Sequence, residues 1–203
     1  MSEAQGLHSF LRSRRSIRSF VPEAIPPSTV ERIIATAAYA PSGHHSQPWR
    51  FVIVTTTEIK SRLADALLAA FRADMDADRV PAADMAARIE KSRSRLLGAP
   101  VVIVLCLERT EESAYRDERR RRAEHRMYVQ SAAAAGLQLL LAAHAEGLAG
   151  VWICSPLFAP QAVTTSLSLP GTWEPQAMYY LGRSDRDPPE KKLKPLEMIT
   201  RWI

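Results

Sequence analysis

An unbroken apolar run, VVIVLCL at residues 101–107, restricts the fold more than any other segment of this chain. No position in the run is polar, so both faces of a strand built from it would need cover. The run is therefore predicted to be a central strand with a layer of helices on each side. Gly98 and Pro100 introduce it, as residues that interrupt a helix.

The remaining segments supply elements for those layers. Strands are predicted at 49–54, 148–153 and 176–182, and helices at 28–40, 60–73, 75–94 (one or two), 118–146 and within 157–170. Ser28 and Glu31 form an expected capping box for the first helix, and Gly147 is expected to end the longest one. The proline-rich stretch 187–203 is predicted to be an arm lying on another surface. We expect one domain, 1–203, and this order of elements also permits a doubly wound parallel sheet.

Composition excludes several classes of function. The net charge of +5 favours anions in general, but the aromatic residues are not interleaved with the basic ones, so no nucleic-acid partner is expected. No apolar stretch approaches the roughly 20 residues that span a bilayer, so no membrane partner is expected either. Cys106 and Cys154 lie in apolar runs without a spaced Cys/His cluster. We therefore expect no metal site, no disulfide framework and a cytoplasmic location, with Cys154 a packed thiol.

Two short motifs could carry chemistry. The first, RRSIR, contains Arg14, Arg15, Ser16 and Arg18, which combine planar guanidinium donors with a small hydroxyl. Such a set suits a phosphate, and in an extended segment Arg14, Ser16 and Arg18 fall on one side. Taken alone, the motif also fits a solvated basic turn.

The second motif, APSGHHSQPWRFVIV at 40–54, places His44 and His45 in a small polar loop before a strand. A zinc site would need a third ligand, and adjacent side chains tend to diverge, so a metal is not expected. A general base stays open, since imidazole titrates near neutrality.

Together the two motifs resemble those of the FMN-dependent nitroreductase family, in which RRSIRxF precedes APSxxxxQPWRFxVV. The segment 132–153 also resembles the family's long helix and following strand. The resemblance implies an α+β three-layer sandwich, with a central, mostly antiparallel sheet flanked by helices and a C-terminal arm. It also implies an FMN-dependent oxidoreductase, with ping-pong hydride transfer from NADH or NADPH to a nitroaromatic, quinone or enone.

The family pattern further implies a homodimer with shared flavin sites. Phosphate contacts would come from the RRSIR motif and from the basic C-terminal segment, although Leu193 stands where many relatives carry an arginine. His45 occupies the place of a flavin-binding asparagine, and His44 would line the loop or the dimer seam. No catalytic acid or base is assigned. The implied cofactor-binding residues are Arg14, Arg15, Ser16, Arg18, Pro41, Ser42, Gly43, His45, Gly150, Val151, Trp152, Lys191 and Lys192.

A third pattern, LxLPxxWEP, resembles the reductase domain fused to the glutamate ligase of the deazaflavin coenzyme. It comprises Leu167, Leu169, Pro170, Trp173, Glu174 and Pro175. Reduction of a deazaflavin precursor and a non-catalytic flavin-binding role are therefore alternatives. The arginine run 119–122 favours a salt-bridged helix start, or else a segment that overhangs the site and attracts an anionic substrate.

Overall fold

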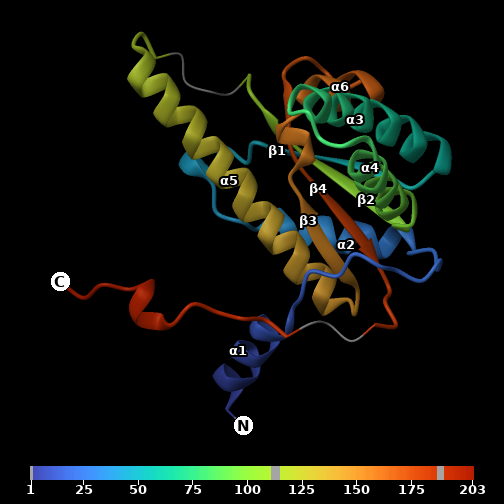
Figure 1. Ribbon diagram of the computed structural model, residues 1–203. Helices are drawn as coiled ribbons and strands as arrows, with labels where there is room; N and C mark the ends of the chain where they lie inside the picture. Colours follow the sequence, from blue (N-terminus) through green and yellow to red (C-terminus); the bar gives the residue numbers. More distant parts are fainter. Residues whose placement is uncertain (1, 111–114, 187–189) are drawn as a thin grey trace.

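The computed structural model describes residues 2–110, 115–186 and 190–203. Figure 1 shows helices on both sides of one sheet, with the C-terminal segment extending away from the body. In chain order the elements are α1 (Glu3–Ser13), α2 (Pro27–Ala37), η1 (Gly43–His45), β1 (Trp49–Val54), α3 (Thr57–Ala77), α4 (Ala82–Leu97), β2 (Val101–Glu108), α5 (Glu118–Ala145), β3 (Ala149–Ile153), η2 (Ser155–Leu157), α6 (Pro160–Ser166), β4 (Trp173–Gly182) and η3 (Leu196–Met198), where η marks a 3₁₀ helix.

The sheet has the strand order β1-β2-β4-β3, and every neighbouring pair is antiparallel. β2 is central, and all of its residues are buried. Alternate side chains of a strand face opposite sides, so Ile103 and Leu105 contact one helical layer while Val102 and Val104 contact the other. The prediction of a central strand at 101–107 is confirmed, and the parallel-sheet alternative is wrong.

Each face of the sheet has its own hydrophobic core. On one face, α2 and α5 supply Ile33, Ala37, Ala135 and Leu139. On the other, α3, α4 and α6 supply Leu63, Leu96 and Val163. This is the expected α+β three-layer arrangement (Figure 1).

The N-terminal region differs from expectation in two ways. Residues 3–13 form α1, which the sequence analysis did not predict; it is capped by the Ser2 side chain and buries none of its residues. The capping box expected at Ser28 and Glu31 does not form, because α2 already starts at Pro27 with no side-chain cap. Proline suits the first turn of a helix because its φ is preset and its missing N–H would have had no partner there.

The helix end at Gly147 is confirmed. Its φ of +72° is the left-handed region that glycine adopts without strain, and its N–H donates to the carbonyl of His144 at 3.1 Å. β4 begins three positions earlier than expected, at Trp173, through an irregularity of register opposite Leu105 and Cys106. Pro175 lies at this irregularity, where its missing N–H is tolerated.

The C-terminal arm, residues 190–203, contains only a short 3₁₀ turn. Its large apolar side chains are exposed, with Trp202 at 96%. An arm was predicted here, and these apolar groups suit contact with another surface. Among the described residues, no helix has the length and apolar character needed to cross a membrane.

Candidate functional site

The N-terminal arginine segment lies against the start of β3. Ser16 forms a parallel bridge with Gly150, and the N–H of Ile17 donates to the Gly150 carbonyl at 3.1 Å. A Cβ on Gly150 would lie 2.8 Å from Leu181 Cδ2 and 3.0 Å from Leu140 Cδ2, so a larger residue would force these two leucine side chains to shift. Two groups of predicted site residues, 14–18 and 150–152, are therefore brought together in one protomer.

Arg14 lines a small cavity of about 70 Å³ together with His144 and Gly150. Its Nη1 atom is buried and has no hydrogen-bond partner in the part of the chain that the structure describes. Burial lowers the pKa of His144, and the positive charge of Arg14 lowers it further. The imidazole therefore stays neutral. Its Nε2 shares a hydrogen bond with the Ser13 hydroxyl at 2.7 Å, and the tautomer decides which of the two donates. A buried donor atom without an acceptor is costly, so the site suits an anion.

The other members of the RRSIR motif have different surroundings. Arg15 Nη1 donates to the carbonyl oxygens of Arg12 and Arg14, so its guanidinium already has partners. Ser16 and Arg18 are exposed. The motif therefore presents, beside β3, two exposed polar side chains and one half-buried arginine whose Nη1 has no partner among the described residues.

The loop predicted to contact a flavin lies elsewhere in the same protomer. The N–H of Gly43 donates to Ser131 Oγ at 3.2 Å, and a Cβ on Gly43 would lie 2.4 Å from Met127 Sδ. The loop is thus held on the N-terminal half of α5, whereas Arg14 lies beside His144 near its C-terminal end. Positions 131 and 144 of α5 are about 20 Å apart along the helix axis. Pro41, Ser42, Gly43 and His45 therefore do not meet the arginine segment within one protomer.

Both histidines of this loop are exposed and have left-handed backbone angles, with φ of 54° at His44 and 56° at His45. Such angles are unusual for residues other than glycine and tend to occur at functional sites. His45 Nε2 lies 3.0 Å from Gln47 Nε2, which fixes the ring. Across residues 2–110, 115–186 and 190–203, no group of His, Cys, Asp or Glu side chains is arranged to hold a metal ion.

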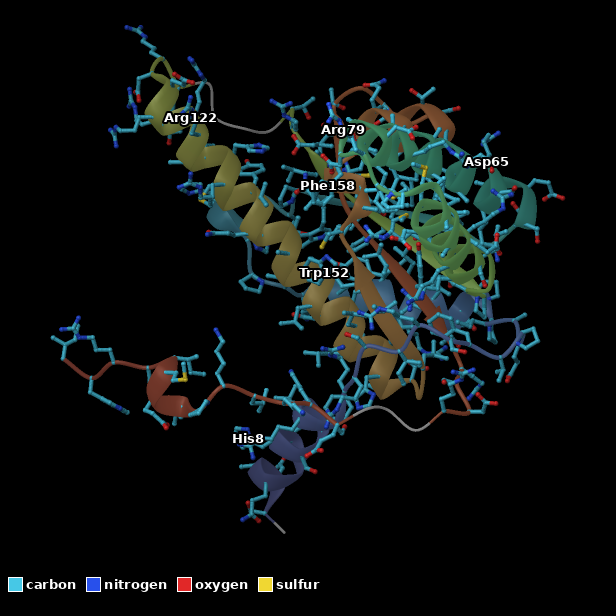
Figure 2. All side chains as sticks on the ribbon, in the orientation of Figure 1. His8, Asp65, Arg79, Arg122, Trp152 and Phe158 are labelled. Atoms are coloured by element: carbon cyan, nitrogen blue, oxygen red, sulfur yellow. The ribbon has the colours of Figure 1, made fainter. Side chains whose placement is uncertain are left out.

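A larger cavity, of about 550 Å³, lies between the α3–α4 pair and the sheet. Its walls are mainly apolar, and its floor is formed by Met178 and Tyr180 of β4. Cys154 and Ser155, which directly follow β3, line its edge with Phe158; Figure 2 labels Phe158 and Trp152 in this part of the chain.

Neither this cavity nor its polar lining was predicted from the sequence. Arg88, Ser92 and Arg95 of α4 all line it. Their spacing of i, i+4 and i+7 places them on one helix face and is the only sequence feature that could have pointed to them. Cys154 is exposed at the cavity edge, so the prediction of a packed thiol there is wrong. The chain leaves β3 at that residue, which is the N-cap of η2.

The two cavities lie at opposite ends of β3. The arginine segment joins it at Gly150, and the large cavity begins around Ile153 and Cys154. Four residues of extended strand span about 13 Å. The small cavity lies on the α5 face of the sheet and the large one on the α3–α4 face, so a ligand that contacts both would have to pass around the edge strand β3.

The LxLPxxWEP pattern makes contacts within the fold. Trp173 Nε1 donates to Glu108 Oε2 at 2.6 Å, and Gln176 Nε2 donates to Glu174 Oε1 at 2.8 Å. Burial acts to raise the pKa of Glu108, but hydrogen bonds from Thr110, Thr172 and Trp173 outweigh it and lower that pKa. The hydrogen bond between Trp173 and Glu108 therefore links the start of β4 to the end of β2.

The arginine run lies at the outer end of α5, where Figure 2 labels Arg122. Arg120 pairs with Asp117, and Arg122 pairs with Glu118. Asp117 also caps the helix by accepting from the N–H of Arg120 at 2.9 Å. The run is thus a salt-bridged helix start. Lys191 and Lys192 lie exposed in the C-terminal arm.

Comparison with known proteins identifies relatives of this chain. The model of the nitroreductase family matches residues 11–183. The chain is 31% identical to 5,6-dimethylbenzimidazole synthase of Rhodospirillum rubrum, over 97% of this chain and 90% of that protein. It is 26% identical to YfhC of Bacillus subtilis, named as an NAD(P)H nitroreductase, over 94% and 90% of the two chains.

Solved structures agree with this relationship. A nitroreductase from Desulfovibrio desulfuricans, solved in complex with FMN, superposes with a TM-score of 0.71 at 25% identity, covering 96% of this chain and 94% of that one. Matches to two iodotyrosine deiodinases are partial, and the chain covers only 30% and 22% of their lengths.

Proposed function

The chain belongs to the nitroreductase family, and from that premise we propose that it is an FMN-dependent oxidoreductase using NADH or NADPH. The acceptor would be an electron-poor molecule such as a nitroaromatic, a quinone or an enone. The FMN complex of one structural neighbour and the name of the Bacillus relative support this proposal. When bound, FMN supplies the two-electron chemistry, while the protein binds and orients the reactants.

The observation that carries the proposal is the buried, unpaired Nη1 of Arg14 beside β3. A phosphate would give this atom the acceptor that it lacks, and charge-assisted hydrogen bonds of this kind are strong. Ser16 and Arg18, exposed on the same segment, would complete the clamp, with Arg15 holding the backbone between them.

The ring would follow the edge of β3 toward the large cavity. β3 is an edge strand, and beyond the bridge at Gly150 no described segment pairs with its outer side, so backbone polar groups are available there. The side chain of Val151 is fully buried, so its contribution would come from its backbone. Trp152 Nε1 is buried without a partner among the described residues and offers one more donor.

The loop residues Pro41, Ser42, Gly43 and His45 would reach the flavin of a second subunit. Within one protomer α5 separates them from the arginine segment by about 20 Å, so a shared site in a homodimer accounts for both motifs. Tyr39 at 87% exposure and Leu137 at 49% provide apolar surface for such an interface. The arm residues Lys191 and Lys192 could then approach a phosphate of either subunit.

The spectrum of the purified protein tests the proposal. We expect a yellow protein whose flavin absorbance bleaches when NADH or NADPH is added without oxygen. A colourless preparation that cannot be reconstituted with FMN would refute the proposal. A yellow protein that neither nicotinamide reduces would favour the non-catalytic flavin-binding role.

Reduction of a deazaflavin precursor rests on the LxLPxxWEP resemblance alone. Trp173 and Glu174 in that pattern make contacts within the fold, which gives no specific support for a substrate. Including a deazaflavin precursor in the acceptor panel would distinguish this alternative from the others.

A further inference from the structure

The large cavity contains two hydrogen-bond donors that lack acceptors. Tyr180 of β4 is only 4% exposed and lines the cavity, and its hydroxyl makes no hydrogen bond within the described residues. Arg95 of α4 also lines the cavity, and in the same part of the chain it makes neither a hydrogen bond nor an ion pair. The guanidinium lies close enough to Tyr180 to act on it electrostatically.

These two groups favour an anionic oxygen. Burial raises the pKa of Tyr180, and the positive charge of Arg95 offsets part of that rise. The phenol therefore stays protonated at neutral pH. Its hydroxyl can donate a hydrogen bond to an acceptor on a bound ligand. A charged oxygen is the acceptor that a hydroxyl and a guanidinium bind most strongly together.

The other walls indicate the shape and orientation of a ligand. Leu67 and Phe71 of α3, with Met178 of the floor, make the cavity suitable for a ring, and its volume of about 550 Å³ is typical of small-molecule sites. Asp74 and Asp78 also line it and are exposed. Their carboxylates would repel an anion held near the surface, so the charged end of a ligand is favoured on the side of Arg95.

We propose that this cavity binds the electron acceptor, and that the acceptor is an aromatic molecule carrying an anionic oxygen group, with Arg95 and Tyr180 as the donors to that group. The reducible end would then lie toward Cys154 and Ser155, where the chain leaves β3. This inference rests on the proposed function, because it assigns the second substrate of the same site.

Equilibrium binding of two matched probes tests the assignment. 4-Nitrobenzoate and its neutral analogue 4-nitrobenzamide would be titrated calorimetrically into FMN-loaded protein and into flavin-free protein. Tyr180→Phe and Arg95→Met are each expected to weaken the benzoate about tenfold or more while changing the amide less than about threefold. Arg72→Met, an exposed position of α3 outside the cavity, is the control and should change neither.

A second variant keeps the test informative if a donor variant fails to fold. Leu68 lines the cavity, and Leu68→Trp should exclude both probes while FMN occupancy and the thermal midpoint stay close to those of the parent. Equal effects on both probes, or no effect of either donor variant, would overturn the assignment. So would probes that bind only flavin-free protein, together with loss of FMN from Arg95→Met, because the flavin itself would then occupy the cavity. A failure of the proposed function would show separately, as a protein that binds no flavin.

Discussion

At the start of β3 the cavity beside Arg14 measures about 70 Å³, and the buried Nη1 of that arginine has no partner among the described residues. At the end of β3 the cavity under α3 and α4 measures about 550 Å³ and is mainly apolar. The first is too small for a ring and has the charge for a phosphate. The second has the volume for a ring and a pair of donors, Arg95 and Tyr180, at one end. The difference is one of chemistry: the arginine segment suits the recognition of charge and the large cavity suits the recognition of a ring, at opposite ends of one short strand.

The largest effect is expected from removing the two arginines that are proposed to bind the FMN phosphate. Arg14→Ala together with Arg18→Ala should weaken FMN binding at least about a hundredfold, since each charge-assisted hydrogen bond contributes roughly 1.5–3 kcal/mol. Fluorescence titration of flavin-free protein measures this directly. Arg12→Ala, in the last turn of α1, is the matched control. Unchanged affinity in the double variant would show that the phosphate binds elsewhere.

Gly150→Ala tests the contact that joins the arginine segment to the strand. The added Cβ would lie 2.8 Å from Leu181 and 3.0 Å from Leu140, both in the packed core. We expect a loss of about 1–3 kcal/mol in the free energy of unfolding, measured in urea. Gly6→Ala in α1 meets no atom within 4 Å and should not reduce stability. Equal stability of the two variants would contradict close packing at Gly150.

Gly43→Ala probes the loop rather than the strand. Its Cβ would meet the side chain of Met127, which is flexible and can move aside. Stability should therefore change little, while the shifted Met127 side chain under the loop should weaken FMN binding about fivefold, or ~1 kcal/mol. The same titration, repeated at protein concentrations above and below dimer dissociation, measures the effect. An affinity independent of both the substitution and the oligomeric state would argue against a shared site.

The smallest effect concerns His144 beside the charged cavity. Because its pKa is lowered in the folded protein, the unfolded chain binds the proton more readily. Its contribution to stability is therefore complete above about pH 6.5 and declines as the pH falls below that value. His144→Gln should flatten this part of the stability profile of flavin-free protein between pH 7 and 5. A bound phosphate near Arg14 should also flatten it, by favouring the charged imidazole. Identical profiles for both proteins would exclude this contribution.

Local sequence patterns predicted the structure correctly where the residue type itself dictates the conformation or the burial. The apolar run 101–107 is the central strand, and Gly147 ends α5 with a positive φ. The capping box predicted at Ser28 and Glu31 does not form, because Pro26 and Pro27 already start the helix. The sequence patterns missed α1 because that helix buries none of its residues, so no core periodicity marks it.

The sequence by itself determined the layered α+β arrangement, through the buried strand and its family resemblance, and it predicted that the arginine segment binds a phosphate. Only the tertiary structure decided that the loop at 41–45 lies on α5, far from that segment, and that Arg95, Tyr180 and Cys154 share one cavity. The reason is that these residues come from α4, β4 and the turn after β3. No local periodicity records which elements the packing of two layers on one sheet will bring together.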